Sequence, residues 1–259
     1  MRRFNALAGE CSFPLITRLL RPLRRVQEQL PATQLPAFLD DDPVLPRLLY
    51  PGTEVKGRYV IEAEIGRGGI ATIYRVQDNR NGKKHALKCL HPELTDQPLY
   101  DVMLRREAAL QRRCLHPHIL ALEDVVATQD GRLALIFPLL QGGTLAERRA
   151  RNNGLNARKA KLIRALLSTA LDVLAAQNIA HLDISPENIM FADESYRSVT
   201  LIDFSLARDC SQPETSAFYK QMFAGKERWA APEIIKGEEV TPACDRYSLD
   251  RVLRASVSG

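Results

Sequence analysis

The glycine-rich stretch EIGRGGIATIY, residues 64–74, most constrains the fold of this chain, because apolar and β-branched segments lie on both sides of it. Such segments are typical of strands, so the glycines are predicted to form the turn of a hairpin. A dinucleotide-binding turn and a Walker loop both need a helix directly after the glycines, and this context excludes them. A glycine-rich hairpin suits a loop that folds over a triphosphate, where backbone N–H groups approach the phosphates closely. Alone the signal is weak, since glycine-rich hairpins are common.

Strand patterns dominate the chain up to Phe137, and helix patterns dominate the rest. Five segments are apolar and β-branched, namely residues 58–65, 71–78, 85–90, 122–128 and 132–137. They predict a five-stranded antiparallel sheet, interrupted by one helix between Leu99 and Cys114. Residues 157–180 then repeat apolar side chains with the 3.6-residue period of a helix buried along one side. The predicted fold class is α+β.

The helix predicted within the sheet region carries one charged side chain in an apolar stripe. Met103, Glu107, Leu110 and Cys114 fall at positions i, i+4, i+7 and i+11, which share one helix face. A buried carboxylate without a partner costs several kcal/mol, so a cation is expected to face Glu107. Lys88 in the segment HALKCL lies on the sheet that this helix must cover. The sequence therefore predicts an ion pair between Lys88 and Glu107.

Further motifs follow in a fixed order along the chain. They are GRGGIATIY, HALKCL, the inward glutamate, HPHIL, QGGTL, HLDISPENI, IDFSLA, AAPE and DRYSL. Together they resemble a protein kinase domain of the bacterial, eukaryotic-like Ser/Thr type, from Gly52 to about Leu253. The resemblance implies a protein kinase-like two-lobe fold, with an N-lobe at 52–140 and a C-lobe at 141–259 that lacks the closing helices of the family. Small-molecule kinases of the aminoglycoside type share the HxDxxxxN loop, but they should lack AAPE and the long segment before it.

The resemblance implies a role for each residue that matches a family motif. Asp183 resembles the catalytic aspartate that accepts the substrate hydroxyl proton, and Lys88, oriented by Glu107, would hold the α and β phosphates of ATP. Asn188 and Asp203 resemble the magnesium ligands. The residues expected to contact ATP are Ile65, Gly66, Gly68, Gly69, Ile73, Ala86, Lys88, Phe137, Pro138 and Leu140. The implied activity is transfer of the γ-phosphate of Mg-ATP to serine or threonine hydroxyls of protein substrates.

Four positions depart from the family pattern. Leu182 replaces the arginine that binds an activation-loop phosphate, and Ser205 replaces the glycine of DFG. Ser185 replaces the lysine that contacts the transferring phosphate, while Lys226 stands where a threonine is expected. Because phosphoryl transfer needs a positive charge more than a particular origin for it, one hypothesis is that Lys226 supplies the charge that Ser185 lacks, and the other is independent drift. The alternative function is a nucleotide-binding pseudokinase that acts as an interaction or regulatory module.

Residues 1–51 differ from the rest of the chain. Six arginines and two glutamates precede residue 31, and leucines recur at helical spacing within residues 13–30, which predicts a basic amphipathic helix. This helix packs on its own domain or contacts a membrane surface or a partner. Prolines at 31, 36, 43, 46 and 51 predict an extended linker, so the folded domain is expected to span 52–259. A helix from about Ala243 is expected to be apolar on several sides, which would favour self-association or a covering segment.

Charge and cysteine usage limit the remaining function classes. The formal charge is +5, but no block of lysine and arginine flanked by aromatic residues is present, so nucleic-acid binding is not expected. The five cysteines form no CxxC pair, which fits a reducing compartment. No apolar run reaches the ~18 residues that a membrane span needs. A cytoplasmic location is therefore expected.

Overall fold

The computed structural model describes residues 49–152, 154–212 and 227–257. Leu49 is buried in the same apolar cluster as Val55 and Tyr59, so the folded unit begins slightly before the predicted boundary at Gly52. The amphipathic helix predicted within residues 13–30 lies outside the described residues.

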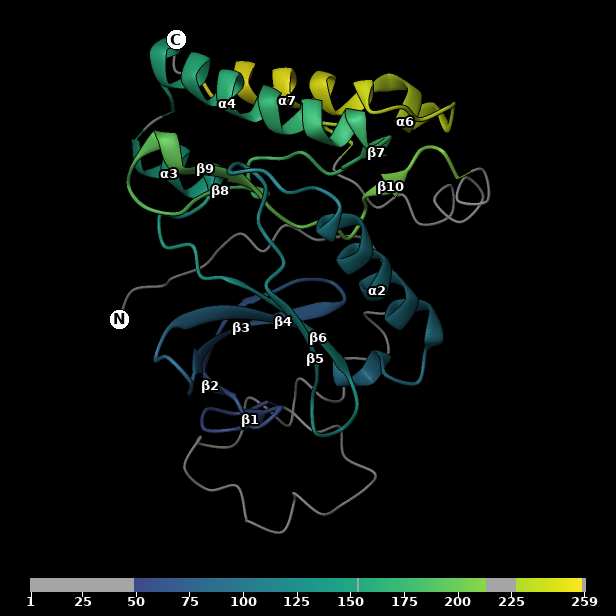
Figure 1. The fold of residues 1–259 in the computed structure, drawn as a ribbon. Coiled ribbons are helices and arrows are strands. Elements are labelled where there is room, and N and C mark those ends of the chain that lie inside the picture. Colours follow the sequence, from purple (N-terminus) through teal and green to yellow (C-terminus); the bar gives the residue numbers. More distant parts are fainter. Residues whose placement is uncertain (1–48, 153, 213–226, 258–259) are drawn as a thin grey trace, which may run out of the picture. The chain divides into compact units, whose positions relative to one another are not determined.

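A six-stranded antiparallel sheet forms the first part of this unit, in the order β1-β2-β3-β4-β6-β5 (Figure 1). The strands are β1 (Glu54–Val55), β2 (Tyr59–Arg67), β3 (Ala71–Asp78), β4 (Lys84–Leu90), β5 (Asp124–Ala127) and β6 (Leu133–Pro138). The five predicted strands are confirmed, and β1 adds a two-residue strand beside β2. On β3, Tyr74, Val76 and Asp78 are buried while Gln77 is exposed, because successive side chains of a strand point to opposite faces.

Helix α2 (Pro98–Arg112) follows the short 3-10 turn η2 (Pro92–Leu94) and confirms the predicted helix. It contacts β4 and β6 (Figure 1). The predicted stripe of Met103, Glu107, Leu110 and Cys114 is buried at every position. The helix therefore presents Glu107 to the sheet, as the apolar period around this carboxylate indicated.

Helices and short strands make up the chain after β6. They are α3 (Leu145–Asn152), α4 (Ala157–Ala176), β7 (Ile179–Ala180), β8 (Ile189–Phe191), η3 (Tyr196–Ser198), β9 (Val199–Leu201), β10 (Arg208–Asp209), α6 (Pro232–Lys236) and α7 (Ala243–Arg254). β7 pairs with β10, and β8 pairs with β9, both antiparallel. Helices α4 and α7 lie side by side (Figure 1), and their buried faces share one apolar core with β8 and β9. The loop between β7 and β8 is therefore anchored at both ends in this core.

The prediction that the helix near Ala243 is apolar on several sides is wrong. In α7, Leu249, Val252 and Leu253 are buried on one face, while the opposite side exposes arginines and one tyrosine, namely Arg246, Tyr247, Arg251 and Arg254. The reason is that its apolar residues follow one narrow stripe, which α4 covers. Self-association thus loses the support that an exposed apolar face of this helix would have given, and it stays an untested prediction.

Two further expectations concern the described residues only. None of the helices in these parts of the chain is long and apolar enough to cross a membrane. The described cysteines are unpaired, and Cys89, Cys114 and Cys244 are buried. Cys89 and Cys114 belong to apolar clusters of the interior, as expected, whereas the thiol of Cys244 donates a hydrogen bond to Glu233 at 3.1 Å.

Candidate active site

The ammonium group of Lys88 on β4 is the centre of the candidate site. It donates hydrogen bonds to both carboxylate oxygens of Glu107 on α2, at 2.7 and 2.8 Å. It also donates to Oδ1 of Asp203 at 2.8 Å and to the hydroxyl of Ser205 at 3.3 Å. The side chains of Lys88 and Glu107 are 8% and 2% exposed, whereas that of Asp203 is 38% exposed. The predicted ion pair is confirmed, and Lys88 connects the sheet, α2 and the segment after β9.

Burial and charge act in opposite directions on these three groups. Burial alone would lower the pKa of Lys88, but the carboxylates of Asp203 and Glu107 outweigh it and raise the pKa. Burial alone would raise the pKa of Asp203, but Lys88 and the hydrogen bonds from Ser205 lower it below its ordinary value. Burial raises the pKa of Glu107, although Lys88 opposes that shift. At neutral pH the site therefore holds a protonated lysine beside an ionised aspartate.

Several residues predicted to contact ATP lie on one face of the sheet. Gly66 of β2 pairs with Ile73 of β3, and Ile73 pairs with Lys88 of β4, so the three form a row across the strands. Ala86 precedes Lys88 by two residues and pairs with Phe137 of β6. Cross-strand partners and alternate residues share a face. The register therefore places these five residues on a common face.

The remaining predicted contact residues lie at the two ends of this face. Gly68 and Gly69 are exposed, and Ile65 is 46% exposed. The N–H of Gly68 donates to the carbonyl of the residue three positions later at 2.8 Å, which closes the hairpin turn. Pro138 and Leu140, at and after the end of β6, are half-buried. All of them remain accessible to a ligand, and their contact with ATP stays a prediction.

Asp183 and Asn188 lie together in the loop between β7 and β8. The Nδ2 group of Asn188 donates to Oδ2 of Asp183 at 2.7 Å and to the Asp183 carbonyl at 2.8 Å. These bonds use the side-chain nitrogen of Asn188, so its side-chain oxygen can still coordinate a cation. The carbonyl of Asn188 accepts from the N–H of Ile202 at 3.0 Å, one residue before Asp203. The loop and the Lys88 cluster are thus joined through β8 and the end of β9.

His181 holds this loop in place. Its Nε2 lies 3.1 Å from the carbonyl of Ile202, and its Nδ1 accepts from the N–H of Asp183 at 3.3 Å. The ring also packs edge-on against Phe204, with centroids 4.8 Å apart. Burial lowers the pKa of His181 to about 4, so the ring is neutral at pH 7 and carries its proton on Nε2. This geometry supports a positioning role.

Asp245 of α7 is a functional position that the sequence reasoning did not assign. Its buried carboxylate accepts from the backbone N–H of His181 at 2.6 Å and from that of Leu182 at 2.9 Å. Leu182 has a φ of +66°, a conformation that non-glycine residues rarely adopt, and these bonds hold it there. Burial raises the pKa of Asp245 to about 6, and the two backbone hydrogen bonds oppose the shift. The signal in the sequence was an acidic residue at the start of a helix with an apolar face, in DRYSL.

Three of the four departures from the family pattern fall on described residues. Leu182 is buried against Ala230 and Ile234, so an apolar contact replaces the charge of the expected arginine. The hydroxyl of Ser205 donates to Oδ1 of Asp203, and its backbone N–H donates to the same oxygen at 3.2 Å. Ser185 is fully buried. Lys226, its predicted substitute, lies outside the described residues.

The side-chain oxygens of Asp203 and Asn188 are too few to hold a hard divalent cation without further ligands from a bound nucleotide. Within residues 49–152, 154–212 and 227–257, no cluster of three or more histidine, cysteine, aspartate or glutamate side chains is arranged to hold a metal ion. Asp203 and Asn188 offer one carboxylate and one amide oxygen. Magnesium bound in this way takes its other ligands from phosphates and water. A metal held by these two residues would therefore depend on a bound nucleotide.

A buried lysine that bridges a sheet, a helix and an aspartate, next to a loop with a second aspartate and an asparagine, is an arrangement typical of protein kinase domains. A sequence model described as the protein kinase domain matches residues 59–259. The chain belongs to the protein kinase domain family. The two-lobe fold is shown independently by a solved kinase domain, PF14_0431, with a TM-score of 0.71 and 22% identity, covering 84% of this chain and 69% of that one.

Three bacterial relatives of the chain are named serine/threonine-protein kinases. PknD of Mycobacterium tuberculosis is 29% identical over 203 residues, which are 78% of this chain and 30% of PknD. PknK of the same species is 32% identical over 196 residues, 76% of this chain and 17% of PknK. PknA of that species is 30% identical over 213 residues, 80% of this chain and 48% of PknA. The chain thus spans less than half of each of these relatives.

Proposed function

We propose that this chain transfers the γ-phosphate of ATP to serine or threonine hydroxyls of protein substrates. The observation that supports this most is the contact of one buried ammonium group, that of Lys88, with both Glu107 and Asp203. A cation held in this way is already oriented when a nucleotide arrives, so little reorganisation is needed during transfer. The relatives are named serine/threonine-protein kinases, which supports the same acceptor class.

In the proposed reaction the substrate hydroxyl oxygen forms a bond to the γ-phosphorus while the bond from that phosphorus to the bridging oxygen of ADP breaks. Asp183 accepts the hydroxyl proton, and the Asn188 amide keeps its carboxylate in position at 2.7 Å. Lys88 holds the α and β phosphates, with Glu107 fixing its direction. Asp203 and the oxygen of Asn188 would hold magnesium, which when bound neutralises charge on the phosphates.

A test is labelled-phosphate incorporation into a mixed protein substrate with ATP and magnesium, for the wild type and for Asp203→Ala. We expect transfer by the wild type and loss by a factor of at least about 10² in the variant, because the metal loses its carboxylate ligand. Equal incorporation by both proteins would exclude the assigned role. Circular dichroism of the variant controls for folding.

One observation favours a second candidate, a nucleotide-binding pseudokinase. Ser205 occupies Oδ1 of Asp203 through its hydroxyl and its backbone N–H, and Lys88 occupies it as well. A metal must compete with all three donors for that oxygen. The second candidate predicts that ATP raises the melting temperature of the wild type without any transfer. It further predicts that Ser205→Gly, which removes one competing donor, strengthens magnesium-dependent nucleotide binding.

A further inference from the structure

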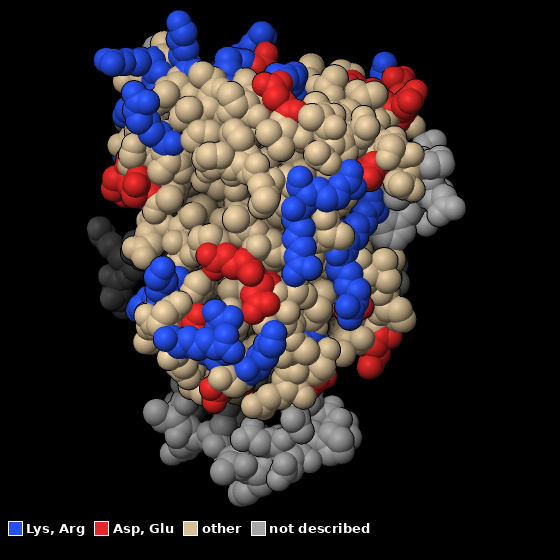
Figure 2. Space-filling model, viewed as in Figure 1, with Lys and Arg blue, Asp and Glu red and all other residues tan. Residues whose placement is uncertain are grey.

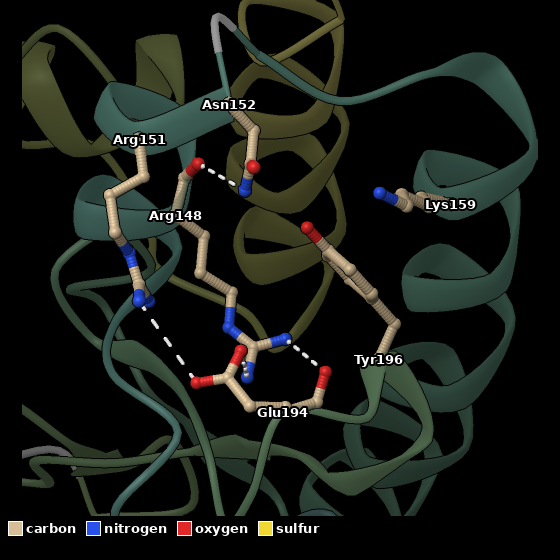
Figure 3. A pocket seen from close by; sticks show the side chains of 6 residues that line it. All are labelled: Arg148, Arg151, Asn152, Lys159, Glu194 and Tyr196. Carbon is tan, nitrogen blue, oxygen red and sulfur yellow. Dashed lines mark hydrogen bonds and ion pairs between the residues drawn. The ribbon is translucent and has the colours of Figure 1, made fainter.

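A hollow of about 220 Å³ lies outside the candidate active site, between the end of α3, the start of α4 and the turn after β8 (Figure 3). Its lining residues are Arg148, Arg151, Asn152, Lys159, Glu194 and Tyr196. In Figure 2, basic side chains gather at the upper left, over α3 and the start of α4 as Figure 1 places them. Three cations and one carboxylate line the hollow, which leaves it with a net positive charge of two.

Arg148 forms the fixed inner wall of this hollow. Its guanidinium donates to the carbonyls of Gly142 at 2.8 Å and Glu194 at 3.1 Å, and also to that of Asp193. It stacks on the ring of Phe191 at 3.8 Å from the centroid. These bonds use three of its five N–H groups, and all three acceptors are neutral carbonyls. Planarity and these contacts therefore fix the direction of its remaining donors before any ligand binds.

The positive charge of Arg148 is weakly compensated. Its side chain is 2% exposed, while the Glu194 carboxylate paired with it lies 3.9 Å away and is 80% exposed. The same carboxylate lies 4.0 Å from the guanidinium of Arg151. Figure 3 shows Glu194 between the two guanidinium groups. A buried cation normally has a closely hydrogen-bonded anion, so a stronger anion than this exposed carboxylate fits the position.

The start of α4 adds further positive potential. Asn156 caps the helix by accepting from the N–H of Lys159 at 2.9 Å, and the first turn contains no acidic residue. The N-terminus of a helix carries partial positive charge, so Lys159 in this turn is unfavourable by itself. Its ammonium lies 4.5 Å from the ring centroid of Tyr196. An anion in the hollow would relieve this repulsion, because its negative charge would lie beside Lys159 at the positive end of the helix.

We propose that this hollow binds the phosphate of a phosphorylated serine or threonine on a protein segment. A phosphomonoester carries about −1.5 to −2 charges near pH 7 and three acceptor oxygens, which matches the net charge of the lining. The guanidinium of Arg148, which lines the hollow, donates to the phosphate. Arg151 approaches the phosphate from the side of Glu194, Lys159 adds positive charge from the side of Tyr196, and the Glu194 carboxylate leaves its place between the two arginines. The recognition is independent of whether the chain itself transfers phosphate.

The test is fluorescence anisotropy of a labelled pentapeptide, Gly-Ala-phosphoserine-Ala-Gly, titrated with the full chain without ATP, because the terminal phosphate of ATP would compete for the same hollow. We expect the phosphopeptide to bind at least about tenfold more tightly than its unphosphorylated form. Arg151→Gln with Lys159→Gln should remove this preference. Arg158→Gln with Lys161→Gln, which makes the same charge change on α4 at residues that do not line the hollow, should keep it. Glu194→Gln should tighten binding, because the competing carboxylate is gone.

Three outcomes would overturn the proposal. The first is equal affinity for the two peptides. The second is an unchanged preference after both substitutions, when circular dichroism shows a folded variant. The third is inorganic phosphate that competes as strongly as the phosphopeptide, which would assign the hollow to the free ion and not to a protein segment.

Discussion

Removing either partner of the Lys88–Glu107 pair is expected to destabilise the chain by different amounts. In Lys88→Met, the Glu107 carboxylate, 2% exposed, loses the cation that lies 2.7 Å away. Leaving one member of a buried pair without its partner costs about 3 kcal/mol or more. In Glu107→Gln, Lys88 keeps Asp203 at 2.8 Å as its counter-ion, so the cost is about 1–2 kcal/mol. Asp203 also loses its contact with Lys88 in Lys88→Met, but this adds little to the cost because its side chain is 38% exposed and stays hydrated.

The assay is urea denaturation at pH 7 without nucleotide, followed by circular dichroism. Lys84→Met is the matched control, since Lys84 lies on the same strand, is 50% exposed and pairs with Glu62 at 3.1 Å. An exposed pair contributes about 0–1 kcal/mol, so the control should change the free energy of unfolding by less than either variant. Combining Lys88→Met with Glu107→Leu should recover much of the loss, because no unpaired charge stays buried. A larger loss in Glu107→Gln than in Lys88→Met would refute the reasoning.

Three other predictions follow from described contacts or from the hypothesis on Lys226. The pKa of His181 is lowered to about 4, so protonation of this residue lowers the free energy of unfolding by about 3 kcal/mol as pH falls from 7 to 4. The pKa of Asp245 is raised to about 6, so protonation of Asp245 raises the free energy of unfolding by a similar amount over the same range. Between pH 7 and pH 4.5, Asp245→Asn should therefore lose more unfolding free energy than the wild type, as measured by urea denaturation. An equal loss in the two proteins would contradict this. Gly142→Ala should cost about 2 kcal/mol, since its Cβ would lie 2.0 Å from the carbonyl oxygen of Asp193; an unchanged melting temperature would contradict it. Lys226→Thr should lose phosphate transfer and Ser185→Lys with Lys226→Thr should restore it, whereas full activity in Lys226→Thr would mean that this charge is not used.

Periodicity alone predicted five strands of the sheet and the helices α2 and α4, because the side chains that carry the pattern are those that the fold buries. The stripe of Met103, Glu107, Leu110 and Cys114 is the clearest example. A single charge in this stripe was enough to predict its partner on another element, since an unpaired buried carboxylate is too costly to persist. The contact with Asp203 was not predicted from the residues, because it joins positions 115 residues apart.

Other features depended on three-dimensional packing that no local pattern encodes. The two residues of β1 are too few to show an alternation, so the sixth strand was missed. In the sequence Asp245 resembles any other helix residue. Only in the fold do two backbone N–H groups of the loop after β7 donate to its carboxylate. The hollow beside Arg148 combines α3, α4 and a turn, and its charge becomes visible only when these elements meet. The apolar character of α7 was overestimated because the family resemblance, and not the helix's own narrow stripe, suggested a helix that is apolar on several sides.

Phosphate transfer to protein hydroxyls, compared between the wild type and Asp183→Asn, tests the central claim most directly. Asn keeps the shape of the side chain and its contact with Asn188 but cannot accept the substrate proton, so folding and nucleotide binding are preserved while the chemistry is not. We predict labelled phosphoserine or phosphothreonine from the wild type with ATP and magnesium, and a rate at least about 10²-fold lower for the variant. Thermal stabilisation by ATP should be the same for both proteins. Absence of transfer by a wild type that binds ATP, or equal rates for the two proteins, would contradict the account.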